Sequence, residues 1–296
     1  MARLINYFFG DTVKGIFVSD IHGSIPRFQH LFQIIQKEKP EAVFFGGDLL
    51  PLHLGIHGSM EEFLETIFFS EIKEIQKEHE SSIRFFVIMG NDDPRMYEPL
   101  FLNAEKKGFL DYVHQKTISY KNLFITGYAY VPPTPFHLKD WERYDVSQFV
   151  DVGVVPPEHG KRTVDVPLDE IKYSTIAEDL ETLACQSPAR KTIYLFHSPP
   201  YHSFLDRADL SGKKIDHVPL DVHVGSIAIQ RFIKTYQPLL TLHGHVHEST
   251  RLTRRWKERF GDTYSFNAAH QGPELAVVRF DTSHLQKACR EIIVVS

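Results

Sequence analysis

The sequence lacks three features that would point to large classes of protein. Only two of its 296 residues are cysteine, so neither a disulfide framework nor a thiolate zinc site is indicated. The formal net charge of -5 gives no general attraction to nucleic acid or to an anionic membrane surface. No apolar run approaches the roughly 18 residues that cross a bilayer. These absences favour a soluble, cytoplasmic protein without membrane partners.

The chain is long enough for one large domain with a sizeable core. Of its residues, 42% are hydrophobic and 24% are charged, and no repeat or linker divides the chain, so we predict a single domain over residues 1–296. The apolar stretch Leu4–Phe9 is short and interrupted by Asn6, and we do not expect it to be a signal peptide. Two proline- and turn-rich stretches, at about 130–168 and 201–222, lose all periodicity and are predicted to be irregular insertions, the first of them an ordered lid.

The first part of the chain alternates between strand and helix patterns. Short apolar runs predict strands, whereas apolar residues at helical spacing predict helices. The predicted strands are 14–19, 41–45, 83–89, 123–129, 191–196, 240–243, 264–267, 275–281 and 291–295, and the predicted helices are 26–37, 60–79, 169–185 and 225–236. This βαβ pattern predicts parallel strands whose carboxyl ends collect functional side chains.

Polar side chains follow these strands at the points where they end. They are Asp20, His22, Asp48, Asn91, His197, His245 and His247. At one such end, a turn is a sufficient explanation, but the repetition indicates a site. His245 and His247 are two residues apart and are expected to point the same way from an extended segment, with Gly244 allowing a tight turn. Carboxylate, amide and imidazole ligands without thiolate suit first-row divalent cations, and only a carboxylate can bridge two of them.

These strand ends resemble the motif blocks of the calcineurin-like metallophosphoesterase superfamily. The blocks stand here as Asp20-Ile21-His22, Gly47-Asp48-Leu49-Leu50, Gly90-Asn91-Asp92-Asp93, His197 and Gly244-His245-Val246-His247. The stretch from His197 through Gln237-Pro238-Leu239-Leu240 further resembles the Icc-like phosphoesterase branch. The resemblance implies a four-layer α/β/β/α sandwich with the site at the carboxyl ends of the strands.

The resemblance also implies a ligand set and a mechanism. Asp20, His22, Asp48 and His247 would hold one metal ion, and Asp48, Asn91, His197 and His245 the other. Such a pair hydrolyses phosphoesters through direct attack of a metal-bridging hydroxide, without a phosphoenzyme. Asn91 would also face the substrate phosphate, because its amide nitrogen can donate while its oxygen binds metal. The metal can be manganese, iron, zinc, cobalt or nickel.

The sequence departs from the family pattern at Asp92, where the family has a histidine that assists the leaving group or binds phosphate. An ionised carboxylate there repels a phosphate, whereas burial among like charges would keep it protonated and able to act as an acid, an effect that two nearby cations oppose. The departure suggests a preference for good leaving groups or a reduced activity. His223, and less so His202, are candidates for the missing histidine. Arg95 and Arg207 are candidate phosphate contacts, although a solvated arginine is the simpler interpretation of each.

Three hypotheses follow. The first is an enzyme, a dinuclear phosphoesterase acting on a small-molecule monoester or diester, with Asn91, Asp92 and His223 as its candidate catalytic residues. The second is a weakly catalytic metal-binding scaffold on the same fold, motivated by Asp92. The third is a nuclease, which the acidic net charge disfavours. A homodimer is expected only because symmetric dimers are the commonest oligomers.

Overall fold

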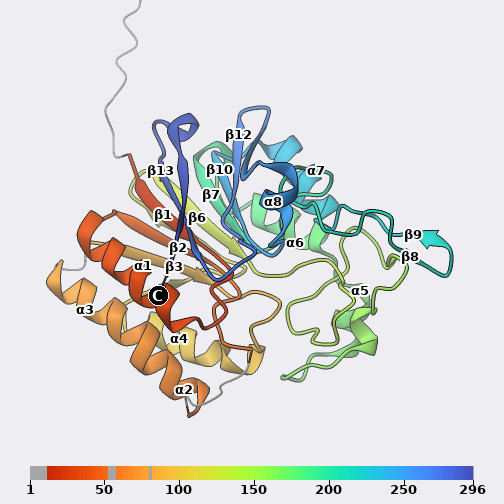
Figure 1. Ribbon diagram of the computed structural model, residues 1–296, viewed down its shortest axis with the longest axis horizontal. Helices are drawn as coiled ribbons and strands as arrows, with labels where there is room; N and C mark the ends of the chain where they lie inside the picture. Colours follow the sequence, from red (N-terminus) through yellow and green to blue (C-terminus); the bar gives the residue numbers. More distant parts are fainter. Residues whose placement is uncertain (1–11, 53–57, 80–81, 296) are drawn as a thin grey trace, which may run out of the picture.

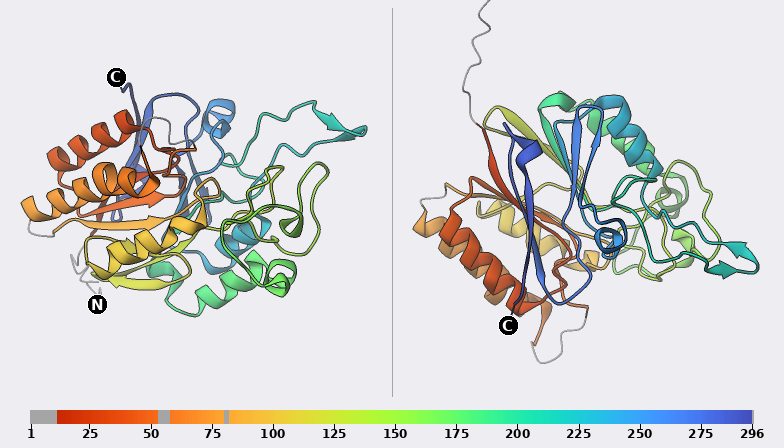
Figure 2. Two further views of the ribbon diagram at one scale, coloured as in Figure 1. Left: turned by 90° about the horizontal axis from the view of Figure 1, so that it is seen from below. Right: turned by 45° about the horizontal axis from the view of Figure 1, so that its top comes forward.

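The structure, a computed structural model, describes residues 12–52, 58–79 and 82–295. Leu4–Phe9 therefore lies outside the described residues. Two six-stranded sheets pack face to face, and helices cover the outer face of each (Figure 1; Figure 2). The predicted α/β/β/α layering is confirmed. Within the described ranges, no helix is both long enough and apolar enough to span a bilayer.

The first sheet has the strand order β14-β13-β1-β2-β3-β4. Its strands are β1 (Lys14–Val18), β2 (Ala42–Gly46), β3 (Arg84–Ile88), β4 (Asp111–Tyr112), β13 (Leu275–Asp281) and β14 (Cys289–Ile293). β1 to β4 are parallel, whereas β13 pairs antiparallel with both β1 and β14. Because β1, β2 and β3 are parallel neighbours, their carboxyl ends meet at one edge of the sheet.

The second sheet has the strand order β11-β12-β10-β7-β6-β5. Its strands are β5 (Thr117–Tyr120), β6 (Leu123–Tyr128), β7 (Thr192–Phe196), β10 (Leu240–His243), β11 (Lys257–Phe260) and β12 (Thr263–Asn267). The four central strands are parallel and the two edge strands antiparallel. β7 and β10 are thus central neighbours that end side by side.

Helices form the two outer layers. Those of the first sheet are α1 (Ile25–Glu38), α2 (Met60–Phe63), the π-helical turn η1 (Leu64–Phe69), α3 (Ser70–Glu78), η2 (Arg95–Tyr97) and α4 (Glu98–Lys106). Those on the side of the second sheet are α5 (Leu168–Tyr173), α6 (Ile176–Ala184) and α7 (Ile227–Tyr236). The remaining elements are η3 (Pro157–His159), η4 (Ala189–Lys191), α8 (Ser249–Thr253), η5 (Leu285–Lys287) and the hairpin β8 (Lys214–Ile215) and β9 (Val218–Pro219).

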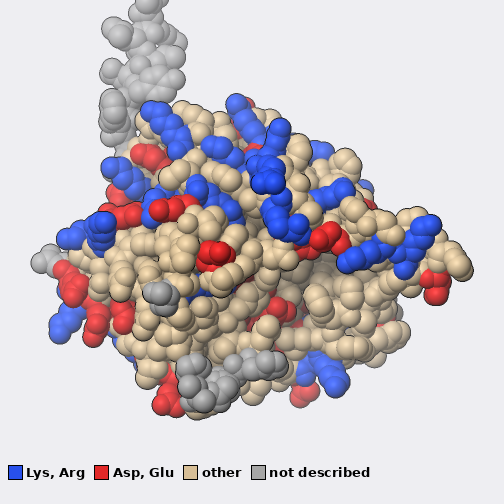
Figure 3. Space-filling model, in the orientation of Figure 1, with Lys and Arg blue, Asp and Glu red and all other residues tan. Residues whose placement is uncertain are grey.

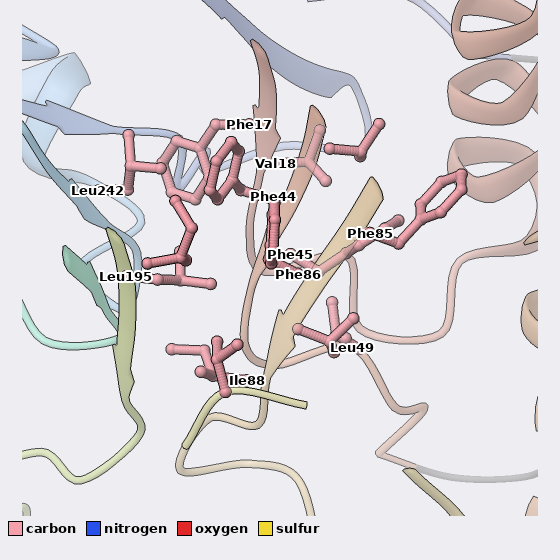
Figure 4. Close-up of a cluster of buried hydrophobic side chains, with 14 of the residues drawn as sticks. Phe17, Val18, Phe44, Phe45, Leu49, Phe85, Phe86, Ile88, Leu195 and Leu242 are labelled. Carbon is pink, nitrogen blue, oxygen red and sulfur yellow. The ribbon is translucent and has the colours of Figure 1, made fainter. Parts of the chain in front are cut away.

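Alternation of side chains along β2 divides the core of the first sheet into two apolar layers. Phe44 points toward the second sheet, where Leu195 and Leu242 face it (Figure 4). Phe45 points to the opposite face and packs against Phe68 of the helical layer, with ring centroids 5.0 Å apart. Successive residues of a strand face opposite sides, so a continuous apolar run suits a strand that is buried on both faces.

Most of the predicted elements form close to the expected positions, with two informative differences. The predicted helix 60–79 forms with a π-helical turn in its middle. The predicted helix 169–185 is two helices, because Thr175 caps α6 in a capping box with Glu178. The insertion 130–168 is irregular apart from η3 and the first residue of α5, and 201–222 is irregular apart from the β8–β9 hairpin.

Candidate metal centre

The strand ends of the two sheets converge and bring their polar side chains together. Asp20 and His22 follow β1, Asp48 follows β2, and Asn91 follows β3 in the first sheet. His197 follows β7, and His245 and His247 follow β10 in the second sheet. Contacts such as those of His197 with Asn91 and of His247 with Asp20 join residues of both sheets, so the cluster lies where the carboxyl ends of the strands meet.

The first group of side chains consists of Asp20, His22, Asp48 and His247. Each offers one ligand atom, and these four atoms all lie within 4.8 Å of one another. His247 Nε2 lies 3.1 Å from Asp20 Oδ1 and 3.1 Å from His22 Nε2. Two imidazole nitrogens at this distance need either a shared proton or a common cation between their lone pairs.

The second group forms around His197, whose side chain is fully buried. Its Nδ1 lies 2.7 Å from the main-chain oxygen of Gly46 and therefore carries a proton that it donates. Its Nε2 faces Asp48 Oδ2 at 3.2 Å and Asn91 Oδ1 at 3.0 Å. In metal-binding histidines, one ring nitrogen commonly donates a hydrogen bond to a carbonyl. This bond sets the tautomer and the ring orientation, so that the other nitrogen can bind the metal.

Asp48 belongs to both groups. The same oxygen, Oδ2, lies 3.2 Å from His197 Nε2 and 4.0 Å from His22 Nε2. The other oxygen, Oδ1, accepts the main-chain N–H of Asp92 at 2.8 Å. Asp48 is almost fully buried, and its carboxylate lies between the two histidines.

Backbone geometry aims several of these side chains. Asp20, His22, Asp48 and His245 have φ values of 57°, 50°, 53° and 71°, in the left-handed region that residues other than glycine rarely adopt. Each such residue costs on the order of 1 kcal/mol or more, and such strain is typical of functional sites.

The expectation that His245 and His247 point the same way is wrong. Because His245 is left-handed, the segment is not extended, and the two rings face different partners. His247 contacts Asp20 and His22, whereas the His245 ring lies 5.3 Å from that of His197. The turn is made by His245 itself; Gly244 matters for another reason, since a Cβ there would lie 2.5 Å from Asp20 Oδ2.

The electrostatics of the cluster call for positive charge. Burial opposes ionisation of Asp20 and Asp48, but His247 acting on Asp20 and His197 acting on Asp48 lower both pKa values. Burial also opposes protonation of His197 and His247, yet the facing carboxylates raise their pKa to about 10 and about 9. Burial and the charge of His197 lower the pKa of His245 to about 4. His197 and His247 therefore each carry a proton that faces the carboxylate of Asp48 or Asp20. Metal ions bound to the same carboxylates would displace these two protons.

The donor set fits a pair of divalent cations. It supplies carboxylate, imidazole and amide groups, and the Nδ1 atom of His22 is buried without a hydrogen-bond partner in the described part of the chain. Asp20, His22, Asp48 and His247 form one candidate site. Asp48, Asn91 and His197 surround a second position, and the His245 ring lies beside it.

Asp92 lies directly at this cluster. Its Oδ1 accepts the side-chain amide of Asn91 at 2.9 Å, and its Oδ2 lies 3.9 Å from His22 Nδ1. About a third of its side chain, 32%, is exposed. Burial and the charge of Asp48 raise its pKa to about 6. A partly exposed carboxylate thus stands at the position where the family has a histidine.

Asp93 supports the cluster through hydrogen bonds and was not among the predicted site residues. Its buried carboxylate accepts the main-chain N–H groups of Leu49, Leu50 and Gly90 at 3.2, 2.8 and 2.9 Å. It thereby ties the loop after β2 to the loop after β3, which fixes Asp48 relative to Asn91. The feature of the sequence that could have indicated this role is that Asp93 occupies the last position of the Gly90–Asp93 block.

His223 lies in a separate cluster. Its Nδ1 is 2.7 Å from Oδ1 of the fully buried Asp206, and its ring lies 4.6 Å from that of His202. Within the described residues, no contact joins either histidine to the metal-ligand candidates. Asp206 was not predicted, and no pattern in the sequence distinguishes it from the other aspartates of its loop.

The two candidate phosphate contacts have partners within the protein. Arg95 donates to Glu98 at 3.2 Å and to the Tyr130 hydroxyl at 3.1 Å. Arg207 donates to the hydroxyl of Ser211 at 3.1 Å. Neither contacts the metal-ligand candidates in the described ranges.

Two layered sheets with such a cluster between their strand ends have the architecture of the metallophosphoesterase sandwich. Residues 14–249 match the model of the calcineurin-like phosphoesterases, and the chain belongs to that family. The structure is similar to that of TT1561 of Thermus thermophilus, with 15% identity and a TM-score of 0.58 over 96% of this chain and 100% of that chain. It is also similar to a dimetal phosphatase from Danio rerio, with 13% identity and a TM-score of 0.54 over 97% of this chain and 100% of that chain. No curated protein sequence matches the chain.

Proposed function

We propose that the protein hydrolyses phosphodiesters with two divalent cations. Asp20, His22, Asp48 and His247 would hold one ion, and Asp48, Asn91, His197 and His245 the other. When bound, such ions polarise the phosphoryl group and make a nucleophile available near neutral pH. The observation that carries the proposal is the single Asp48 oxygen that faces His197 at 3.2 Å and His22 at 4.0 Å, because a dinuclear site needs one shared carboxylate.

The remaining residues orient the substrate. Asn91 directs its amide oxygen toward His197 Nε2, while its amide nitrogen donates to Asp92 and is available to a phosphate oxygen. Asp93 and Gly46 hold Asp48, Asn91 and His197 in place through buried hydrogen bonds, so little reorganisation is needed when substrate arrives.

Asp92 favours a diester over a monoester. A phosphomonoester is a dianion near neutral pH and a phosphodiester a monoanion, so a nearby carboxylate repels the monoester more strongly. Asp92 also removes the histidine that would assist a poor leaving group. His223, held by the buried Asp206, is a candidate proton donor to a larger substrate, although it does not contact the ligand cluster.

The test compares bis(p-nitrophenyl) phosphate with p-nitrophenyl phosphate as substrates. The protein is stripped of metal, assayed, and then resupplied with manganese. We expect metal-dependent hydrolysis with kcat/KM higher for the diester. If neither ester is hydrolysed while metal analysis shows two ions bound, the enzyme proposal fails and a metal-binding scaffold takes its place.

A further inference from the structure

A band of Lys and Arg side chains follows one rim of the hollow in the face shown in Figure 3. By comparison with Figure 1, it runs from the region of α8 to the β8–β9 hairpin. We call five exposed residues in or directly next to these elements the basic rim: Lys213, Lys214, Arg251, Arg254 and Arg255. The net charge of -5 for the whole chain conceals this local excess.

Arg251 pairs with Asp209 at 2.9 Å, whereas the other four cations form no ion pair within the residues that the structure describes. Arg255 stacks on Phe204, and its charge acts on Glu258 without a direct ion pair. The nearby carboxylates accept hydrogen bonds from main-chain groups. Glu248 accepts the N–H of Asp209 at 3.0 Å, and Glu258 accepts the N–H of Phe204 at 2.8 Å.

A partly exposed aromatic ring lies beside the basic rim. The guanidinium of Arg255 lies 4.1 Å from the centroid of the Phe204 ring, and 38% of Phe204 remains exposed. Thr253 joins the main chains of this pair, because its hydroxyl donates to the main-chain oxygen of Phe204 and accepts the main-chain N–H of Arg255. An exposed aromatic ring next to a planar cation is a surface on which a nucleic-acid base can stack.

A second group of rings consists of Tyr201 and His202, on the same segment as Phe204, and of His223. Tyr201, His202 and His223 contact one another, with 4.6 Å between the two imidazole centroids. The buried Asp206 holds this arrangement, since it bonds the His223 ring at 2.7 Å and accepts the N–H groups of His202 and Ser203 at 2.9 and 3.0 Å. These rings are therefore presented in a fixed orientation.

Both ring-bearing and charge-bearing segments begin at the metal centre. The segment with Tyr201, His202 and Phe204 begins four residues after His197, and α8 begins two residues after His247. A bond from the N–H of Asp209 to Glu248 joins the two segments. The segments that carry this surface are thus continuous in the chain with the loops that hold the metal-ligand candidates.

We propose that this surface binds single-stranded nucleic acid, with phosphates on the basic rim and bases on the exposed rings. The proposal rests on the proposed function and names its substrate class: a phosphodiester linkage of an oligonucleotide. RNA and DNA share this chemistry. Counterion release makes such binding depend on salt, with a slope of about 0.7 per phosphate contact for a single strand.

The test measures binding without cleavage. Metal-stripped protein in chelator is titrated with fluorescein-labelled oligo(U) and oligo(dT) of about 12 nucleotides, in about 50 to 200 mM salt, and anisotropy is recorded. In the variant Arg254→Glu/Arg255→Glu, we expect affinity to fall at least about tenfold and the salt slope by about 1.4. Phe204→Ala should lower affinity without changing the slope.

A matched control carries the same charge change elsewhere. Lys106→Glu/Lys107→Glu alters two exposed lysines at the end of α4, in the outer layer of the first sheet, and should bind within about twofold of the wild type. Equal losses in the two double variants, or wild-type affinity in the rim variant, would overturn the proposal. So would binding to phosphatidylserine vesicles without binding to either oligonucleotide. Preference between oligo(U) and oligo(dT) distinguishes RNA from DNA.

Hydrolysis separates this proposal from the proposed function. Bis(p-nitrophenyl) phosphate has no flanking phosphates, so the rim variant should hydrolyse it at the wild-type rate while losing cleavage of the oligonucleotide. If the wild-type protein binds oligonucleotides but hydrolyses no diester, the proposed hydrolase activity is wrong and the proposed binding surface is supported. If the protein hydrolyses the small diester but binds no oligonucleotide, only the proposed binding surface is wrong.

Discussion

The indole N–H of Trp141 donates to the main-chain oxygen of Asp93 at 2.7 Å. This bond joins the insertion between β6 and α5 to the turn that carries Asn91. Trp141 is fully buried, and the His114 ring packs against it with centroids 4.9 Å apart. Because Asp93 also holds the loop after β2, the insertion braces both acidic loops of the metal centre.

Trp141→Phe should lower both stability and metal affinity. It keeps most of the buried ring but leaves the Asp93 oxygen without its donor, which costs about 1–3 kcal/mol in the free energy of unfolding. Urea unfolding and calorimetric titration with manganese measure the two effects. Trp256→Phe is the control, because the Trp256 indole N–H makes no hydrogen bond within the described residues. Unchanged metal affinity in Trp141→Phe would contradict the bracing role.

Asp48→Ala should remove the ligand that both cations share. We expect diester hydrolysis to fall at least about 100-fold and two-ion binding to be lost, since even outer-shell changes weaken metal sites 10- to 100-fold. Metal content and kcat/KM are measured together, and circular dichroism checks the fold. Activity near the wild-type level would show that Asp48 is not the bridge.

Periodicity and strand endings predicted the architecture of this chain well. Buried parallel strands are continuous apolar runs, such as 41–45, and they are easily recognised. The polar residues after them were correctly expected to meet, because parallel neighbours end at a common edge. The sequence could not predict which way each side chain points, since Asp20, His22 and His245 adopt left-handed conformations that no local pattern marks.

Elements whose stability comes from tertiary contacts escaped prediction. The edge strand β11 reads KERF and lacks an apolar pattern, and it forms because it pairs with β12. The break between α5 and α6 depends on the capping box at Thr175 and Glu178, which overrides a helical pattern that continues across it. Asp206 and Trp141 act through contacts made by irregular segments, where periodicity carries no information.

Glu142 should make stability fall with rising pH. Its side chain is buried beside Lys139 and Thr134, and burial raises its pKa from 4.5 to about 7 despite the opposing charge of Lys139. The folded state therefore binds this proton more tightly than the unfolded state does. The resulting stabilisation is complete below about pH 4.5 and is lost as the pH rises through about 7.

Urea unfolding of Glu142→Gln over this pH range tests the assignment. The free energy of unfolding of the variant should not show the fall that Glu142 causes. The wild type should therefore lose stability relative to the variant as the pH rises. Glu181→Gln, at an exposed position of α6, should keep the wild-type pH dependence. Parallel curves for the wild type and Glu142→Gln would show that another group titrates.

Asp92→Asn should shift the substrate preference toward monoesters. The substitution keeps the shape of the side chain and an oxygen that can accept from Asn91, but it removes a negative charge beside the phosphate position. At an effective dielectric constant of about 20 or more, one charge within several ångströms is worth on the order of 1–2 kcal/mol. We therefore expect kcat/KM for p-nitrophenyl phosphate to rise about tenfold relative to that for bis(p-nitrophenyl) phosphate. Asp165→Asn, an exposed site in the insertion, is the matched control and should leave the ratio unchanged. If the ratio is unchanged in Asp92→Asn as well, the carboxylate does not select the diester, and the preference must come from the missing histidine alone.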